Sequence, residues 1–221
     1  MKKICLIAVL VMTFVSASAL ALPVIQTENY NFPLSPNQDT LTFNQFNMAG
    51  FTLTEVRLEI YTSISANVTC ENDSQLPADI QLGMTGSAEA TGGGLDVTAS
   101  INYLSPVTSL TATDGVAGSG GDFHDFGLIE ANDTKFDSLY LGIDDLTPFI
   151  GAGTIDILVD GLGGHAVTGT TDYNLEVSNF GADGYVEIQY IYTQVPEPAT
   201  IMLVASSLVG IVGIARRKLK K

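Results

Sequence analysis

The sequence feature that most constrains the fold is an alternation of apolar and polar positions with a period of two. Val56, Leu58 and Ile60, for example, are each separated from the next by one charged residue. Successive side chains of a β-strand point to opposite faces of the sheet, so this period predicts strands with one apolar face. Strands are predicted in this way at residues 40–46, 56–61, 97–103, 123–129, 136–141, 155–159, 173–180 and 186–192.

Sheets with one apolar face need a second layer that covers it. The sequence therefore predicts an all-β fold, a two-sheet antiparallel β-sandwich of the jelly-roll kind. The alternation breaks at residues 143–150, where Leu146, Phe149 and Ile150 are spaced for one short helical connector across the end of the sandwich. Glycine runs predict turns between strands at residues 92–94, 118–121 and 161–164.

Residues 1–21 have the three parts of a secretory signal peptide. Two lysines follow the first methionine, an apolar stretch comes next, and small residues stand at Ala19 and Ala21. We predict cleavage after Ala21, so that residues 22–194 remain as one exported domain. A permanent N-terminal membrane helix is the alternative, which the short apolar stretch and the good cleavage motif disfavour.

An uncharged apolar segment at residues 199–215 is followed by a basic end at residues 216–221. As a helix it would span about 26 Å, close to the roughly 30 Å of the hydrocarbon core of a bilayer. Basic residues favour the cytoplasmic side, so this segment is predicted to be a transmembrane helix with the preceding chain outside. An ordinary single-pass anchor is the simplest interpretation.

The flanks of this segment carry a more specific signal. A Pro-Glu-Pro triplet precedes the apolar segment and an Arg-Arg pair follows it. This order over residues 195–221 resembles the PEP-CTERM sorting signal of Gram-negative bacteria. The resemblance implies that an exosortase, a membrane processing enzyme, recognises the triplet and cleaves near it, while the arginines act as a cytoplasmic stop. The residues assigned to the signal in this way are Pro196, Glu197, Pro198, Arg216 and Arg217.

The exported part resembles a second family, the choice-of-anchor E domains. Those domains are β-rich, carry interchangeable C-terminal anchors and have no established catalytic residues. The resemblance implies a β-rich surface protein over most of residues 27–193. The pieces that carry it are residues 41–46 and 53–64, a Phe-Gly pair at 126–127, residues 146–159 and the closing strand at 184–192.

The exported part is strongly acidic. It holds 23 acidic residues against Arg57 and Lys135, a formal charge of −21. Such a surface repels nucleic acid and anionic lipid, so no nucleic-acid partner is predicted, whereas divalent cations and neutral glycans are compatible with it. An acidic surface also serves solubility alone.

Cys70 is the only cysteine of the exported part. It ends an alternating apolar series with Ile64, Ala66 and Val68. This position predicts a buried small apolar side chain, and pairing with a thiol of another molecule is the alternative.

Residues with catalytic or metal-binding potential are scattered. His124 and His165 lie far apart and no nucleophile motif accompanies them, so we predict a protein that is not an enzyme and needs no cofactor. Calcium is possible because it takes six to eight oxygens from carboxylates and loop carbonyls. Aspartates are also ordinary turn residues, however, and no known calcium-loop motif is present. The calcium candidates are Asp122, Asp125, Asp144 and Asp145, with His124 beside the first pair.

These features predict an exported envelope protein that is anchored in the inner membrane in transit and then reaches the cell surface or the extracellular matrix. The PEP-CTERM resemblance implies a structural or adhesive role linked to exopolysaccharide and biofilm. A calcium-dependent carbohydrate-binding module, similar to a lectin, is the alternative, and a secreted hydrolase is a third hypothesis.

Overall fold

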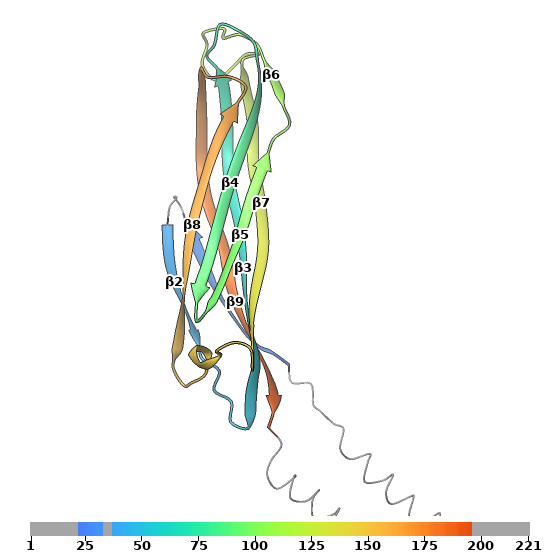
Figure 1. The fold of residues 1–221 in the computed structure, drawn as a ribbon. Helices are drawn as coiled ribbons and strands as arrows, with labels where there is room; N and C mark the ends of the chain where they lie inside the picture. Colours follow the sequence, from blue (N-terminus) through green and yellow to red (C-terminus); the bar gives the residue numbers. More distant parts are fainter. Residues whose placement is uncertain (1–21, 33–36, 196–221) are drawn as a thin grey trace, which may run out of the picture.

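The computed structural model describes residues 22–32 and 37–195, and most of them lie in strands (Figure 1). Within these ranges the helical content is one 3₁₀ turn, η1 (Thr147–Phe149), and no helix is long and apolar enough to cross a membrane. The predicted signal peptide at residues 1–21 and the predicted membrane helix at residues 199–215 lie outside the described residues.

The strands form the two antiparallel sheets of a sandwich, which confirms the predicted fold class. They are β1 (Val24–Phe32), β2 (Asn37–Asn44), β3 (Phe51–Asn72), β4 (Ala78–Gly92), β5 (Leu95–Leu104), β6 (Thr108–Leu110), β7 (Phe123–Tyr140), β8 (Thr154–Thr168) and β9 (Tyr173–Gln194). One sheet has the order β1-β9-β3-β7 and the other β2-β8-β4-β5, with β6 paired to β4. This is the strand order of a jelly roll.

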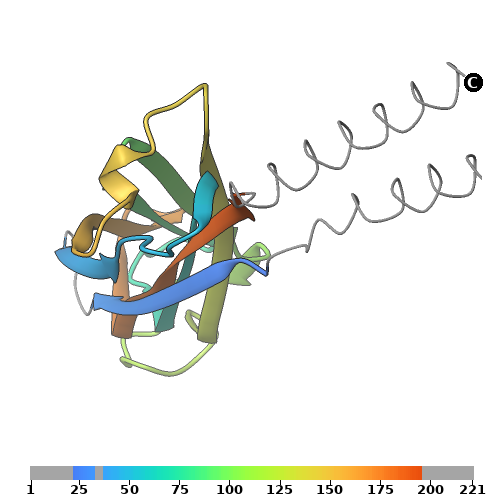
Figure 2. The ribbon, with the colours of Figure 1, turned by 90° about the horizontal axis from the view of Figure 1, so that it is seen from below.

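The sandwich is elongated because its central strands are long. β3 and β9 have 22 residues each, which at roughly 3.3 Å per residue gives about 70 Å. β1 and β2 are shorter and cover only one half of its length (Figure 1). Val24 pairs with Tyr190, so the start of β1 and the end of β9 lie together at what we call the exit end (Figure 2). The opposite, distal end is formed by the loops at residues 73–77, 111–122 and 169–172.

The apolar positions of the alternating pattern meet between the sheets. In the half near the exit end, Phe43, Phe149 and Tyr190 are at most 1% exposed and belong to one core cluster. A second cluster fills the distal half and includes Leu82 and Cys70. Cys70 is buried, as its place in the alternating series predicted.

The turn predicted at residues 161–164 is wrong, because these residues lie inside β8. A Cβ on Gly161 would collide with the ring of Phe32, and a Cβ on Gly163 would lie 3.2 Å from Cζ of Phe180. The two glycines therefore leave room for aromatic rings that reach across from the facing sheet, a common reason for glycine within a strand.

The other two glycine runs form turns as predicted. Gly93 and Gly94 have φ values of +61° and +94° and close the two-residue hairpin between β4 and β5, which is the conformation that a tight hairpin of this type requires. Residues 118–121 lie in the loop between β6 and β7.

The short helical turn predicted between β7 and β8 is confirmed, but only two of the three side chains predicted to pack from it are buried. Leu146 and Phe149 are 3% and 0% exposed, as the spacing predicted. Ile150, however, is 50% exposed. The helix is a single 3₁₀ turn, and Ile150 has already left it with an extended backbone at φ −111° and ψ 123°, so its side chain does not follow that of Phe149 into the core.

Candidate functional site

The end of β9 connects the sandwich directly to the predicted sorting signal. Gln194 pairs with Phe51, and the N–H of Val195 donates to the carbonyl of Gly50 at 2.8 Å. The sheet therefore continues to the residue before Pro196. From Ile191 onwards β9 pairs with β3 alone, because β1 pairs with β9 only as far as Tyr190. The predicted signal residues Pro196, Glu197, Pro198, Arg216 and Arg217, and the predicted cleavage positions Ala19 and Ala21, lie outside the described residues.

The outer face of the sheet β1-β9-β3-β7 carries three aromatic rings, one of them exposed and two half-buried. Tyr61 on β3 and Tyr185 on β9 are direct cross-strand partners, and their rings stack with centroids 5.3 Å apart at 14°. Phe136 on β7 pairs with Glu59, the position two residues from Tyr61, and is 59% exposed. Cross-strand partners share one face of a sheet, so Tyr61, Tyr185 and Phe136 form one surface, which we call the aromatic platform.

Charged groups border the aromatic platform. The Arg57 guanidinium lies 3.7 Å from the centroid of the Phe136 ring and forms an ion pair with Glu59 at 3.1 Å. The pKa of Tyr185 is raised, mainly by burial and also by the nearby negative charges of Glu59 and Glu187. The Tyr185 hydroxyl therefore stays protonated, and remains a hydrogen-bond donor, into alkaline solution. Aromatic rings beside carboxylates and a guanidinium suit a ligand with apolar C–H faces and many hydroxyls, such as a sugar.

The residues of the aromatic platform were not among the predicted site residues. Tyr61 and Tyr185 both stand at polar positions of alternating strands, and this was visible in the sequence. The register that places them opposite each other was not visible.

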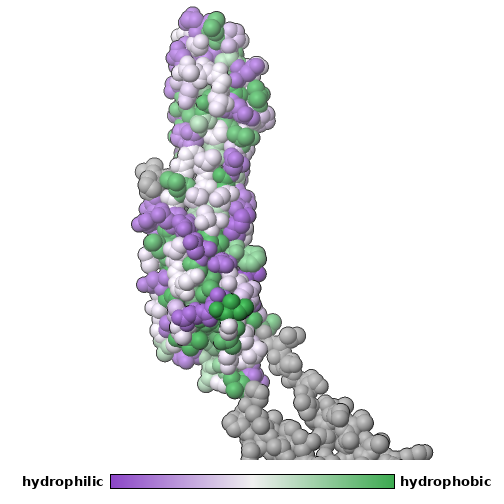
Figure 3. Space-filling model, in the orientation of Figure 1, coloured by the Kyte–Doolittle hydropathy of each residue, from purple (hydrophilic) through white to green (hydrophobic). Residues whose placement is uncertain are grey.

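On the face seen in Figure 3, hydrophilic and hydrophobic residues are interspersed along the length of the sandwich.

The structure does not bring the four calcium candidates together. Asp122 precedes β7 and Asp144 follows it, so the two pairs lie at opposite ends of an 18-residue strand. Three of the four carboxylates accept hydrogen bonds from backbone N–H groups of their own turns. Asp125 accepts from Gly127 at 2.7 Å, Asp144 from Tyr140 at 2.8 Å, and Asp145 from Thr147 at 2.9 Å.

Asp122 differs from the other three because it is buried, with 0% exposure. Its Oδ2 accepts the N–H of Asp114 at 2.8 Å, and its carbonyl accepts the N–H of Asn72 at 2.8 Å. Its Oδ1 has no hydrogen-bond partner within the described part of the chain. In that part no group of three or more His, Cys, Asp or Glu residues is arranged to hold a metal ion.

Asn72 organises the loops around Asp122. This residue, 0% exposed, donates through Nδ2 to the carbonyls of Leu76 and Thr111 at 2.9 and 2.8 Å. Its Oδ1 accepts from Ser74 N–H and Thr170 Oγ1, both at 3.3 Å. One side chain thus joins all three distal loops, a role that no pattern in the sequence predicts.

The two histidines lie on strands of different sheets. His124 on β7 packs edge-on against Phe126 with ring centroids 4.6 Å apart, and His165 on β8 lies 6.4 Å from the ring of Phe180. Each imidazole is thus next to a phenyl ring.

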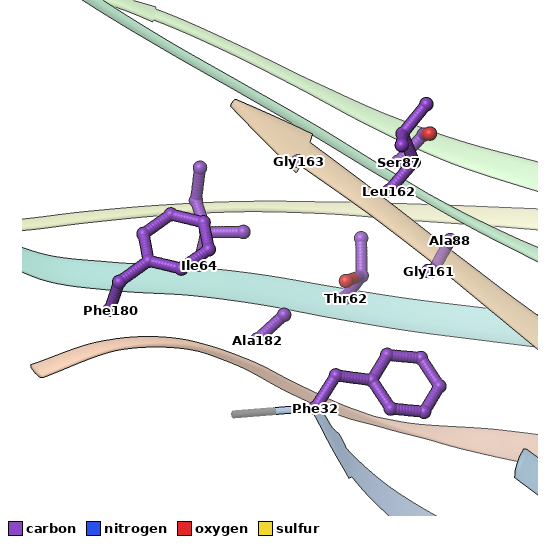
Figure 4. A pocket seen from close by; sticks show the side chains of 10 residues that line it. All are labelled: Phe32, Thr62, Ile64, Ser87, Ala88, Gly161, Leu162, Gly163, Phe180 and Ala182. Atoms are coloured by element: carbon purple, nitrogen blue, oxygen red, sulfur yellow. The ribbon is translucent and has the colours of Figure 1, made fainter. Parts of the chain in front are cut away.

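A small cavity lies between the sheets, near the middle of the sandwich. Phe32 and Phe180 border it, with Thr62 and Ile64 on β3 between them (Figure 4). Its volume of about 20 Å³ is enough for one water molecule. A more open groove of about 350 Å³ lies at the distal end, between residues 74–78 and 169–171.

Residues 194–218 match the family described as the PEP-CTERM protein-sorting motif, which confirms the sorting signal predicted from the sequence. This motif implies export, transit through the membrane and processing by an exosortase, which is a membrane enzyme. The choice-of-anchor E resemblance is not among these findings and stays a prediction. No curated protein is significantly similar to the chain in sequence.

Among solved structures, the chain has a weak similarity to infectious bursal disease virus proteins. For the Gt strain, the identity is 13% over 85% of this chain and 49% of that chain, with a TM-score of 0.13. For the Gx strain, the identity is 13% over 91% of this chain and 51% of that chain, with a TM-score of 0.14. For the VP2 subviral particle, the identity is 11% over 89% of this chain and 49% of that chain, with a TM-score of 0.13. The chain spans about half the length of these proteins, and the TM-scores are too low to support any argument.

Proposed function

We propose that this chain, which carries a PEP-CTERM sorting motif, is a non-enzymatic envelope protein whose β-sandwich serves a structural or adhesive role at the cell surface or in the extracellular matrix. The observation that carries the proposal is the motif at residues 194–218, whose first residue, Gln194, is also the last residue of β9. The folded domain and the sorting motif are thus consecutive, with no intervening linker.

The shape of the sandwich supports a role in presenting a surface. Both β1 and β9 reach the exit end (Figures 1 and 2), so attachment through residues 196–221 leaves the distal end and both outer faces pointing away from the attachment point. Long central strands make the domain a spacer of about 70 Å. Such a spacer suits a component of a surface layer.

The aromatic platform supports exopolysaccharide as the ligand. Tyr61, Tyr185 and Phe136 lie on one sheet face, where their rings can contact the apolar faces of sugar units. Glu59 and Glu187 stand beside them as acceptors for hydroxyl groups. The formal charge of −21 favours a neutral glycan over an anionic one, because like charges repel.

The first experiment tests sorting. The full-length chain is expressed in a Gram-negative host that has an exosortase and in the same host with the exosortase gene deleted. The proposal expects a shorter, surface-delivered form in the first host and a longer, membrane-held form in the second. An identical mass and location in both hosts would refute the sorting part of the proposal.

The second experiment tests adhesion. Full-length protein is incubated with exopolysaccharide from that host, and bound protein is measured after sedimentation. Tyr185→Ala and Tyr61→Ala are expected to weaken binding at least tenfold each, whereas Tyr173→Ala, on the same strand as Tyr185 but at the distal end, leaves it unchanged. Equal binding by all variants would remove the aromatic platform from the account.

The same experiment separates the two other functions. Glycan binding that is lost with EDTA would favour a calcium-dependent lectin-like module over a structural component. Release of reducing ends from the glycan would instead show a hydrolase and would contradict the proposal that the protein is not an enzyme.

A further inference from the structure

We infer that the loop between β6 and β7 binds one calcium ion through Asp114 and Asp122. This inference is independent of the proposed function and begins with Asp122 Oδ1. That atom is buried and has no hydrogen-bond partner among the described residues, whereas nearly all buried polar atoms of proteins are paired. A buried carboxylate oxygen without a partner is costly, so this oxygen needs either a donor or a cation.

A second carboxylate lies beside this oxygen. Asp114 Oδ1 accepts the N–H of Val116 at 2.8 Å, and Asp114 Oδ2 accepts no hydrogen bond in the part of the chain that the structure describes. A Cβ on Gly120 would lie 2.6 Å from Asp122 Oδ1 and closer still to Asp114 Oδ2. The two oxygens are therefore no farther apart than two calcium–oxygen bonds of about 2.6 Å placed end to end.

Glycine at position 120 is what allows this approach. Gly120 has φ +97°, and any side chain there would push into both carboxylates at once. Asp114 is exposed whereas Asp122 is buried behind it, so an ion can enter from solvent past Asp114 and end against Asp122. The loop thus brings two carboxylate oxygens together, and carboxylate oxygens are among the ligands that calcium prefers.

The negative charge of the Asp114 and Asp122 carboxylates is not neutralised by a described lysine or arginine side chain. Arg57 pairs with Glu59, and Lys135 pairs with Asp133, so both are committed elsewhere. The described residues contribute no group of three or more carboxylates, histidines or cysteines arranged for a metal. Loop carbonyls and water would complete the coordination, which is typical of extracellular calcium modules with Kd of roughly 10⁻⁴–10⁻³ M.

The test uses the full-length chain, purified in detergent. We expect Tm to be higher in calcium chloride than in EDTA, by about 5–10 °C when free calcium exceeds Kd about 100-fold. Isothermal titration should give one calcium per chain. Magnesium at the same concentration should raise Tm less, because it demands a tighter octahedral arrangement.

Three variants locate the effect. Asp114→Asn and Asp122→Asn should each abolish the calcium-dependent rise in Tm, whereas Asp125→Asn should keep it, because that carboxylate is exposed and accepts the N–H of Gly127. Since Asp114 is exposed, Asp114→Asn should still fold even if Asp122→Asn does not.

Alanine substitutions at two glycines separate the loss of the calcium site from the effect of backbone strain. Gly118 and Gly120 both have positive φ, so alanine strains the backbone at either position, but only at Gly120 does the added Cβ meet the two carboxylates. Gly120→Ala should lose the calcium response and Gly118→Ala should keep it. The inference is overturned if Tm is the same in calcium and EDTA, or if the response survives in Asp114→Asn or Gly120→Ala.

Discussion

Replacing Asn72 with alanine should destabilise the distal end by an amount that the structure allows us to work out. The side chain is 0% exposed and makes two short donor bonds, to Leu76 and Thr111 carbonyls at 2.9 and 2.8 Å. Each lost bond costs about 0.5–1.5 kcal/mol, and a carbonyl left buried without a partner costs more. The two weaker bonds that Oδ1 accepts add little. We expect Asn72→Ala to lower the free energy of unfolding by about 2–4 kcal/mol.

Urea unfolding of the full-length chain in detergent measures this change. The midpoint should fall while the slope m stays the same, and Tm should fall by about 5–15 °C. Asn67→Ala is the matched control, because Asn67 lies on the same strand, half-buried on the other face, with no side-chain hydrogen bond among the described residues. It should change stability by less than about 0.5 kcal/mol. A loss of similar size in both variants, or of less than about 0.5 kcal/mol in Asn72→Ala, would refute this reasoning.

Three further predictions follow from other parts of the structure. Gly161→Ala should destabilise the protein by about 1–3 kcal/mol, because its Cβ would collide with Phe32, whereas Gly181→Ala, with open space around it, should not; thermal unfolding compares them. Burial raises the pKa of Cys70 from 9.0 to about 11 and those of Tyr30 and Tyr190 from 10.0 to about 12. Since these groups ionise earlier in the unfolded chain, their contribution to stability should be fully present below about pH 9 and be lost as pH rises towards 12, which urea midpoints measured at each pH from about 8 to 12 would show. A flexible spacer inserted between Val195 and Pro196 should speed cleavage in a pulse-chase experiment, because the Val195 N–H is bound to Gly50; an unchanged rate would contradict this.

The alternating pattern predicted the core and the sandwich well, because burial of one face imposes a period of two. It divided long strands too finely, however. The strands predicted at residues 123–129 and 136–141 both lie in β7, and those at 173–180 and 186–192 both lie in β9. In β7 the two predicted strands are separated by residues 130–135, which are polar apart from Ala131. In β9 two residues, Asn179 and Phe180, lie between the partners of Ser65 and Asn67, where β3 has only Ala66, and this marks a bulge on β9. A bulge changes the phase of the alternation without ending the strand.

β4 was missed for a different reason. Its inward positions include Gly86, Ala88 and Ala90 in the middle of the strand, where a Cβ on Gly86 would lie 3.0 Å from Ile64. Small residues there make room for larger side chains of the facing sheet, and they weaken the apolar signal by which a strand is recognised.

The candidate site was less accessible to sequence reasoning than the fold. Asp122 was selected for its place after a glycine run, but its partner Asp114 was not, since which two turn aspartates meet depends on how the loop folds. Tyr61 and Tyr185 stand more than 100 residues apart in the chain, and only the pairing of β3 with β9 brings them together. The sorting motif was the exception, because its signal is local in the sequence.

We propose that an exosortase processes this protein at its sorting motif, and the intact mass and C-terminal peptide of the protein recovered from its own host test this most directly. We expect a species that ends near residues 195–198 and lies outside the inner membrane. A species that keeps residues 216–221 and stays in the membrane fraction would contradict it, would make residues 199–215 an ordinary anchor, and would remove the main support for a role in the surface matrix.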